Sequence, residues 1–292
     1  MSLSIAFLDR HPIGRPLAVV IRAVWRPLFA LRCHWDVYRV LQERARLVRQ
    51  SPDWQGLPRA PHAGQVRGLS QIMHNGLRVR LGCYYGWGCV PLFYKTKGIH
   101  EPQEEIAFAA VLPCLPPGAV MLELGSYWAF YSMWFAQRVP GARNFLVEPD
   151  THCMKMGRDN FARNNFTGHF TQAFVSRTSN PTRGGVPQLT VDAFCATHSL
   201  ERIHLLHADI QGYELEMLEG ARCTLGEDRV DFLFLSTHSE PLHAACRAHL
   251  AAHTRLGVIL DVPPAQSYSV DGILVAARRG LATPEVNVAL RS

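Results

Sequence analysis

The chain has 292 residues, of which 48% are hydrophobic and 18% charged. This composition supports a sizeable packed core and excludes global disorder. The eight cysteines form no Cys-x-x-Cys pair, which argues against a zinc site and for reduced thiols in a cytoplasmic protein. No uncharged apolar run reaches the roughly 20 residues that a membrane-spanning helix needs.

The net charge of +6 is unevenly distributed along the chain. Residues 1–100 hold 15 Lys or Arg against 4 Asp or Glu, a balance of +11, and the other 192 residues carry a balance of −5. Nucleic acid, a peripheral contact to an anionic membrane, an acidic protein partner or simply a solvated basic face would explain this excess. Within it, residues 16–41 mix apolar residues with Arg, and we expect a helix docked on the protein's own core or on a second subunit, as in a homo-oligomer.

Regular elements are predicted from about residue 70 onward, after a Pro- and Gly-rich loop at residues 51–66. Strands then alternate with helices of 10–14 residues, which predicts a mostly parallel α/β sheet covered on both faces. The predicted strands are residues 76–82, 119–124, 144–149, 169–176, 202–210, 230–238, 256–262 and 269–278. The predicted helices are residues 101–115, 129–139, 152–165, 213–222 and 241–253.

The carboxyl ends of such strands are where ligands bind, so the residues that follow each strand are the first candidates. The first strand ends in "ELGSYWAFYS" (123–132), which has Gly125 but lacks the later glycines of a dinucleotide-binding loop. Glu148 follows the second strand, 23 residues after Gly125, at the spacing of a carboxylate that holds ribose hydroxyls. The alternative for Glu148 is a cap on the helix that follows.

The fourth and fifth strands also end in polar side chains. Asp209 and Gln211 leave the fourth strand, and His238 leaves the fifth. If these strands are neighbours, Asp209 and His238 lie close together and could remove a proton or hold a cation. A divalent metal is compatible with this pair but is not predicted. The alternative for His238 is a polar residue that meets solvent at a strand end.

Five stretches together resemble the FkbM family of S-adenosylmethionine-dependent methyltransferases. They are "HEPQEE" (100–105), "LELGSY" (122–127), "FYS" (130–132), "LVEPD" (146–150) and "LLHADIQGYELEMLEGA" (205–221), of which the last is the most specific. The resemblance covers roughly residues 98–277 and implies a Rossmann-like class I methyltransferase fold with a seven-stranded sheet. Departures from the family pattern are Tyr127 for Asn, Ala129 for Gly, His207 for Lys and Gln211 for Glu.

The resemblance also implies which residues bind S-adenosylmethionine. Glu148 would hold the ribose, Gln172 and Ala173 would lie near the adenine, and Asp209 would lie near the methionine moiety or the reacting centre. The full set of cofactor candidates is Glu101, Glu123, Gly125, Ser126, Tyr127, Glu148, Pro149, Gln172, Ala173 and Asp209. Asp209 and His238 are the catalytic candidates.

The function predicted from this resemblance is O-methylation of a hydroxyl on a sugar or secondary-metabolite-like small molecule. The alternatives are an RNA or peptide methyltransferase and a non-catalytic Rossmann-like binding protein. Nucleic acid is not the expected partner, because no RNA-binding motif precedes the domain. We expect a basic, aromatic extension at residues 1–97, which forms a cap, an oligomer contact or a substrate platform, and a cofactor-binding domain at residues 98–292. Segment 82–95 either borders the acceptor pocket or packs in the core or an interface.

Overall fold

The computed structural model describes residues 38–179 and 182–292. The chain divides into two compact units, Met1–Glu43 and Arg44–Ser292, and the fold and the site described below belong to the larger unit. The helix expected within residues 16–41 lies outside the described residues, except for 38–41, which are helical. In the part of the chain that the structure describes, no helix is long and apolar enough to cross a membrane.

The centre of the larger unit is a seven-stranded sheet with the strand order β11-β12-β10-β9-β4-β5-β6. All strands run in one direction except β12, which is antiparallel to both of its neighbours. Strands β4 and β10 are buried along their whole length, which explains their continuous apolar sequences. The strands are β4 (Val120–Leu124), β5 (Arg143–Val147), β6 (His169–Thr171), β9 (Ile203–Ala208), β10 (Val230–Thr237), β11 (Leu256–Val262) and β12 (Gly272–Arg278).

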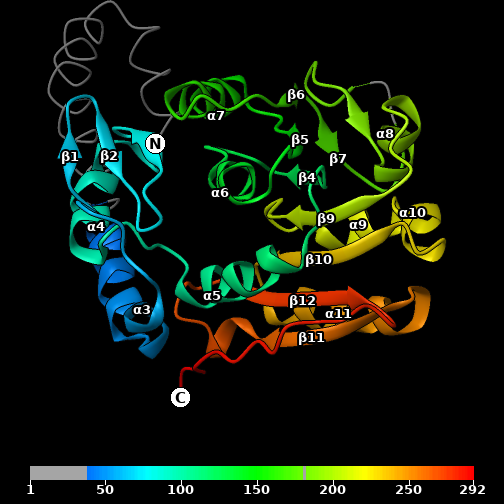
Figure 1. The fold of residues 1–292 in the computed structure, drawn as a ribbon. Coiled ribbons are helices and arrows are strands. Elements are labelled where there is room, and N and C mark those ends of the chain that lie inside the picture. The colour runs from blue at the N-terminus through cyan, green and yellow to red at the C-terminus, as the bar shows by residue number, and fades with distance from the viewer. Residues whose placement is uncertain (1–37, 180–181) are drawn as a thin grey trace, which may run out of the picture. The chain divides into compact units, whose positions relative to one another are not determined.

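Helices cover both faces of this sheet (Figure 1). One face carries α5 (Pro102–Val111), α6 (Phe130–Arg138) and α7 (Thr151–Arg163). The other carries α8 (Val191–Thr197), α9 (Glu214–Glu219), α10 (Arg222–Gly226) and α11 (Glu240–His253). The prediction of a mostly parallel seven-stranded sheet between two helical layers is therefore confirmed.

A small sheet and two helices precede α5 and pack against the same unit. They are α3 (Pro52–Gly56), β1 (Val66–Arg67), β2 (Ser70–Ile72), β3 (Arg78–Arg80) and α4 (Cys89–Thr96), with a single helical turn, η1, at Gly86–Gly88. Strand β3 lies on α7, because the Asn160 and Asn164 side-chain oxygens accept the backbone N–H groups of Arg80 and Arg78 at 2.8 and 2.9 Å. This attachment places the segment around η1 beside the carboxyl ends of the sheet strands.

Three predicted elements differ from the structure. Residues 51–66 are not all loop, because Ser51 caps α3 and Pro52 begins it. The strand predicted at 169–176 is broken: β6 ends at Thr171, and β7 (Phe174–Val175) leaves the main sheet to pair with β8 (Gln188–Leu189). The helix predicted at 213–222 stops at Glu219, where Gly220 lies so close to the Ser176 backbone that a Cβ would be 2.4 Å from its carbonyl oxygen.

Candidate functional site

Two adjoining cavities lie at the carboxyl ends of β4, β5 and β9. The larger has a volume of about 460 Å³ and the smaller about 60 Å³. The larger is lined mainly by residues that follow strands β4, β5 and β9, and it includes the predicted residues Glu148, Pro149 and Ala173. The predicted residues Glu101, Glu123 and Ser126 line the smaller cavity. Five residues line both: Tyr85, Gly125, Tyr127, Asp209 and Gln211.

The loop after β4 shows why one of the expected glycines is indispensable. Gly125 has φ +73°, and a Cβ at this position would lie 1.9 Å from the backbone oxygen of Asp209. The N–H groups of Gly125 and Ser126 both donate to Val147 O, at 2.9 and 3.1 Å. The next N–H, that of Tyr127, donates to Glu148 Oε2 at 2.9 Å. Since all three amides have partners within the protein, none is left for a pyrophosphate, which agrees with the sequence argument against a dinucleotide.

The two substituted positions in this loop keep the backbone conformation for which Asn and Gly are suited. Tyr127 has φ +44° and Ala129 has φ +64°, a left-handed region that costs an ordinary residue roughly 1–2 kcal/mol. The Tyr127 hydroxyl accepts the Tyr85 N–H at 2.8 Å, and its ring lies 6.0 Å from that of Tyr84 between centroids. The substitution at 127 therefore links the cofactor loop to the segment before η1.

Glu148 is aimed at the larger cavity and does not cap the next helix. Its Oε1 accepts the Asp150 N–H and its Oε2 accepts the Tyr127 N–H, both at 2.9 Å. The cap of α7 is Asp150, whose side chain accepts the N–H groups of His152 and Cys153, both at 2.8 Å. Burial raises the pKa of Glu148. Gln172 lines neither cavity: its side-chain nitrogen donates to Pro149 O at 3.1 Å.

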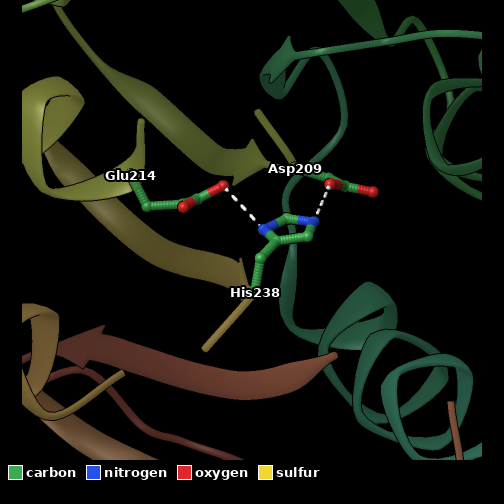
Figure 2. Close-up of side chains that lie close together, drawn as sticks. All are labelled: Asp209, Glu214 and His238. Atoms are coloured by element: carbon green, nitrogen blue, oxygen red, sulfur yellow. Dashed lines mark ion pairs between the residues drawn. The ribbon is translucent and has the colours of Figure 1, made fainter. Parts of the chain in front are cut away.

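The sequence argument that Asp209 and His238 would meet is correct, because β9 and β10 are parallel neighbours. His238 Nε2 lies 3.1 Å from Asp209 Oδ1, and Nδ1 lies 3.2 Å from Glu214 Oε1. Figure 2 shows the imidazole between the two carboxylates, with a different ring nitrogen facing each. Gln211 Nε2 also donates to Asp209 Oδ1, at 2.8 Å.

Electrostatics favour a charged imidazole in this cluster. Burial alone would lower the pKa of His238, but its bonds to Asp209 and Glu214 raise it to about 10. In return, although burial opposes ionisation, His238 lowers the pKa of Asp209 below its usual range. The ligand atoms of Asp209, Glu214 and His238 lie within 4.8 Å of one another. The imidazole lies between the two carboxylates and is clamped by them, with one ring nitrogen facing each.

The smaller cavity is rich in charged side chains from elements far apart in the sequence. Arg44 donates to Glu101 Oε1 at 2.8 Å, and the Tyr131 hydroxyl donates to Glu101 Oε2 at 2.9 Å. Burial raises the pKa of Glu123 to about 7 and that of Asp271 to about 7. Two carboxylates of this cavity therefore titrate near neutral pH.

A second layer of buried charges supports this cavity from α5. Glu104 accepts from His207 Nε2 at 2.8 Å and from the Ser236 hydroxyl at 2.9 Å. Burial alone would raise the pKa of Glu105, but the adjacent His74 and His100 hold it well below its usual range. These pairs explain the acidic first turn of α5, whose carboxylates face inward to fixed partners rather than to solvent.

Several cavity residues were missed by sequence reasoning. Arg44 and Asp271 lie outside the stretches that carry the family resemblance, and no local pattern distinguishes them from other charged residues. Glu214 lies in the helix predicted at residues 213–222, where an acidic side chain simply suits a helix start. Its complete burial, and its acceptance of the Ile210 and Gly212 N–H groups, depend on the tight turn between β9 and α9. Tyr84 and Tyr85 of segment 82–95 line the smaller cavity, and the expectation that this segment borders the acceptor stays a prediction.

A family model described as "Methyltransferase FkbM domain" matches residues 118–257. Residues 118–257 are an FkbM methyltransferase domain. The protein is thus a methyltransferase, its sheet is the predicted Rossmann-like sheet of a class I methyltransferase, and the family implies S-adenosylmethionine as the methyl donor. No protein with a curated description matches the chain.

Solved structures of other methyltransferases resemble the chain weakly. An O-methyltransferase from Bacillus cereus in complex with SAH is 14% identical, with a TM-score of 0.41, over 60% of this chain and 80% of that one. The ribosomal protein L11 methylase from Lactobacillus delbrueckii subsp. bulgaricus is 12% identical, with a TM-score of 0.43, over 62% and 81%. A precorrin-6y C5,15-methyltransferase from Geobacter metallireducens is 16% identical, with a TM-score of 0.37, over 59% and 87%.

Proposed function

We propose that this FkbM methyltransferase transfers the methyl group to a hydroxyl oxygen of a small-molecule acceptor. The observation that carries the proposal is the position of Asp209. Among the described residues it is the one carboxylate that lines both cavities, and His238 keeps it ionised. A hydroxyl that enters where the cavities adjoin would meet a group able to take its proton.

The larger cavity fits the adenosine part of S-adenosylmethionine. Its volume of about 460 Å³ is within the usual range for a ligand pocket, roughly 300–1,000 Å³. Each Glu148 oxygen accepts one backbone N–H and keeps a lone pair that can accept a ribose hydroxyl. Ala173, Phe174 and Val175 supply an apolar wall for the adenine. When bound, the cofactor supplies an electrophilic methyl group on a sulfonium.

Asp209 and His238 then have different roles. A charged imidazole has no free lone pair, so His238 cannot accept a proton in that state. We assign proton acceptance to an Asp209 carboxylate oxygen and assign His238 to positioning that carboxylate. Tyr85, which is 51% exposed, and Gln211 line both cavities and would border the path by which the acceptor enters.

Calorimetry with S-adenosylmethionine tests the cofactor part of the proposal. We expect the wild type to bind and Glu148→Ala to lose at least about tenfold in affinity, because a carboxylate's hydrogen bonds to ligand hydroxyls disappear. The matched control is Glu201→Ala, at an exposed position just before the amino end of β9, away from the carboxyl ends of the strands. It should bind like wild type. Folded wild-type protein that does not bind would refute the cofactor site.

A labelled methyl group tests the reaction. The protein is incubated with S-adenosylmethionine carrying an isotopic methyl and with a panel of polyhydroxylated compounds, each paired with its amino analogue. We expect the label on hydroxyl oxygen. Label found solely on nitrogen would overturn the O-methylation proposal while leaving the methyltransferase assignment intact. Cofactor binding without transfer to any acceptor, RNA and peptides included, would favour a non-catalytic binding protein.

A further inference from the structure

The smaller cavity presents opposite charges within a very small space. Its volume is about 60 Å³, and its walls include the guanidinium of Arg44, the hydroxyl of Ser126 and the carboxylates of Glu123 and Asp209. Hydrogen-bond donors and anionic acceptors in one small cavity match a ligand group that itself carries both charges. An α-amino acid end, with one ammonium and one carboxylate, is such a group.

Two of the donors have no hydrogen-bond partner among the described residues. Arg44 Nε and Ser126 Oγ are both buried and make no hydrogen bond, although another Arg44 nitrogen, Nη2, donates to Glu101. Ser126 is only 3% exposed. Buried polar atoms without partners are uncommon and costly, so each one calls for an explanation. A ligand oxygen in the cavity that both side chains line would satisfy them.

Arg44 is well held for this task. Its side chain is 12% exposed, its guanidinium carbon lies 5.4 Å from the centroid of the Tyr84 ring, and Glu101 accepts from Nη2. A planar guanidinium fixed on one edge by a carboxylate and on one face by a ring retains N–H groups in the geometry that suits a second carboxylate.

We propose that Arg44 and Ser126 bind the carboxylate of the amino acid end of S-adenosylmethionine. This inference rests on the proposed function, since it assumes that the cofactor's adenosine occupies the larger cavity. Gly125, Tyr127 and Asp209 line both cavities, so one ligand can occupy the two together. Arg44 lies outside the matched domain at residues 118–257. Its contact with the carboxylate would therefore be a contribution of the N-terminal part of this chain to cofactor binding.

The test compares two ligands that differ only at the relevant end. S-adenosylhomocysteine has the amino acid end, whereas 5′-methylthioadenosine keeps the adenosine and the sulfur but lacks it. Calorimetry of the full chain with each ligand should show Arg44→Gln weakening S-adenosylhomocysteine binding about 10- to 100-fold, with 5′-methylthioadenosine affinity unchanged. Arg44→Lys, which keeps the charge but loses the planar fork, should give an intermediate loss.

A double variant distinguishes two roles of Arg44: binding of the ligand carboxylate and neutralisation of the Glu101 charge. Arg44→Gln leaves Glu101 without its cation, whereas Arg44→Gln with Glu101→Gln removes both charges. If Arg44 binds the ligand, the double variant binds S-adenosylhomocysteine more weakly than Glu101→Gln alone. If Arg44 only neutralises Glu101, the double variant binds like Glu101→Gln alone and the proposal is wrong. Thermal melting confirms that each variant is folded, and Arg80→Gln, which loses an exposed ion pair with Asp159, is the control for removal of an arginine.

Two other outcomes also overturn the proposal. Equal losses for both ligands would show a general distortion of the site. Unchanged S-adenosylhomocysteine binding with a raised acceptor KM would show that Arg44 binds a carboxylate of the acceptor instead. Failure of the wild type to bind either ligand would refute the cofactor site itself, so the two proposals fail in distinguishable ways.

Discussion

The two cavities share five residues but are built from different parts of the chain. The larger draws its walls mainly from residues 125–213, which follow successive strands of the sheet, and much of its lining is apolar. The smaller adds Arg44, Tyr84, Glu101 and Asp271, which come from before and after the matched domain. Under the proposed function, the matched domain recognises the adenosine, and residues before and after it recognise the other end of the cofactor.

The two cavities also differ in how their charge responds to pH. Of the carboxylates that line the smaller one, Glu123 and Asp271 each have a pKa near 7 because burial opposes their ionisation. The larger has Glu148, whose pKa burial also raises, and it shares Asp209, whose pKa is lowered. A change of pH around neutrality therefore alters the charge of two carboxylates in the smaller cavity.

Gly125, which lines both cavities, gives the largest expected effect. Gly125→Ala would place a Cβ 1.9 Å from the Asp209 backbone oxygen, and we expect a loss of more than about 3 kcal/mol in the free energy of unfolding. Gly212→Ala is the matched control, since Gly212 has φ +101° and open space around its Cβ. It should cost only the backbone strain, about 1–2 kcal/mol. Equal losses in denaturant titrations would contradict the close contact.

Asp209→Asn tests the assigned proton acceptor at the boundary between the cavities. The amide keeps the shape of the side chain but is a far weaker base, so the rate of methyl transfer at saturating cofactor should fall about 100-fold or more. The rate is measured with the acceptor that gives the fastest label transfer. A rate within a few-fold of wild type would remove Asp209 from the chemistry.

The clamped imidazole behind Asp209 makes stability depend on pH. The pKa of His238 is raised from 6.5 to about 10 in the folded protein, so its stabilising contribution is fully present below pH 6.5 and is lost as the pH rises through 10. We expect the free energy of unfolding to fall by up to about 5 kcal/mol across this window. His238→Gln should remove this part of the slope. Parallel curves for both proteins in denaturant titrations would show that His238 is not clamped.

Tyr127→Phe tests the link between the cofactor loop and the segment before η1. It deletes the acceptor of the Tyr85 N–H while it keeps the ring, at an expected cost of about 1 kcal/mol. Hydrogen exchange of the Tyr85 amide should accelerate. Tyr94→Phe, at an exposed ring in α4, is the matched control, and an unchanged Tyr85 amide would disprove the link.

Ala129→Gly is expected to have the smallest effect. The position is left-handed, with φ +64°, so glycine relieves strain, but removal of a fully buried methyl group offsets part of the gain. We expect a net stabilisation of about 0.5 kcal/mol, seen as a higher melting temperature. A clear loss of stability would mean that packing of this methyl outweighs the strain.

The sequence by itself determined the sheet, its helical layers and six of the 14 residues that line the larger cavity. Alternating apolar runs fix strands and helices locally, and residues that follow parallel strands must share one edge of the sheet. That reasoning placed Gly125, Glu148 and Asp209 together and brought His238 to Asp209. It failed at residues 169–176, because the change of sheet between β6 and β7 depends on pairing with the distant β8.

Tertiary structure alone decided the smaller cavity and the protonation of its neighbours. Arg44 and Glu101 are separated by 57 residues in the chain, and Asp271 lies 170 further on than Glu101, so no local pattern could bring them together. The pKa of His238 likewise depends on Glu214, which the tight turn after β9 places 3.2 Å from the imidazole. The sequence shows which side chains can ionise. Their burial and their partners, which set their pKa values, exist only once distant elements have packed.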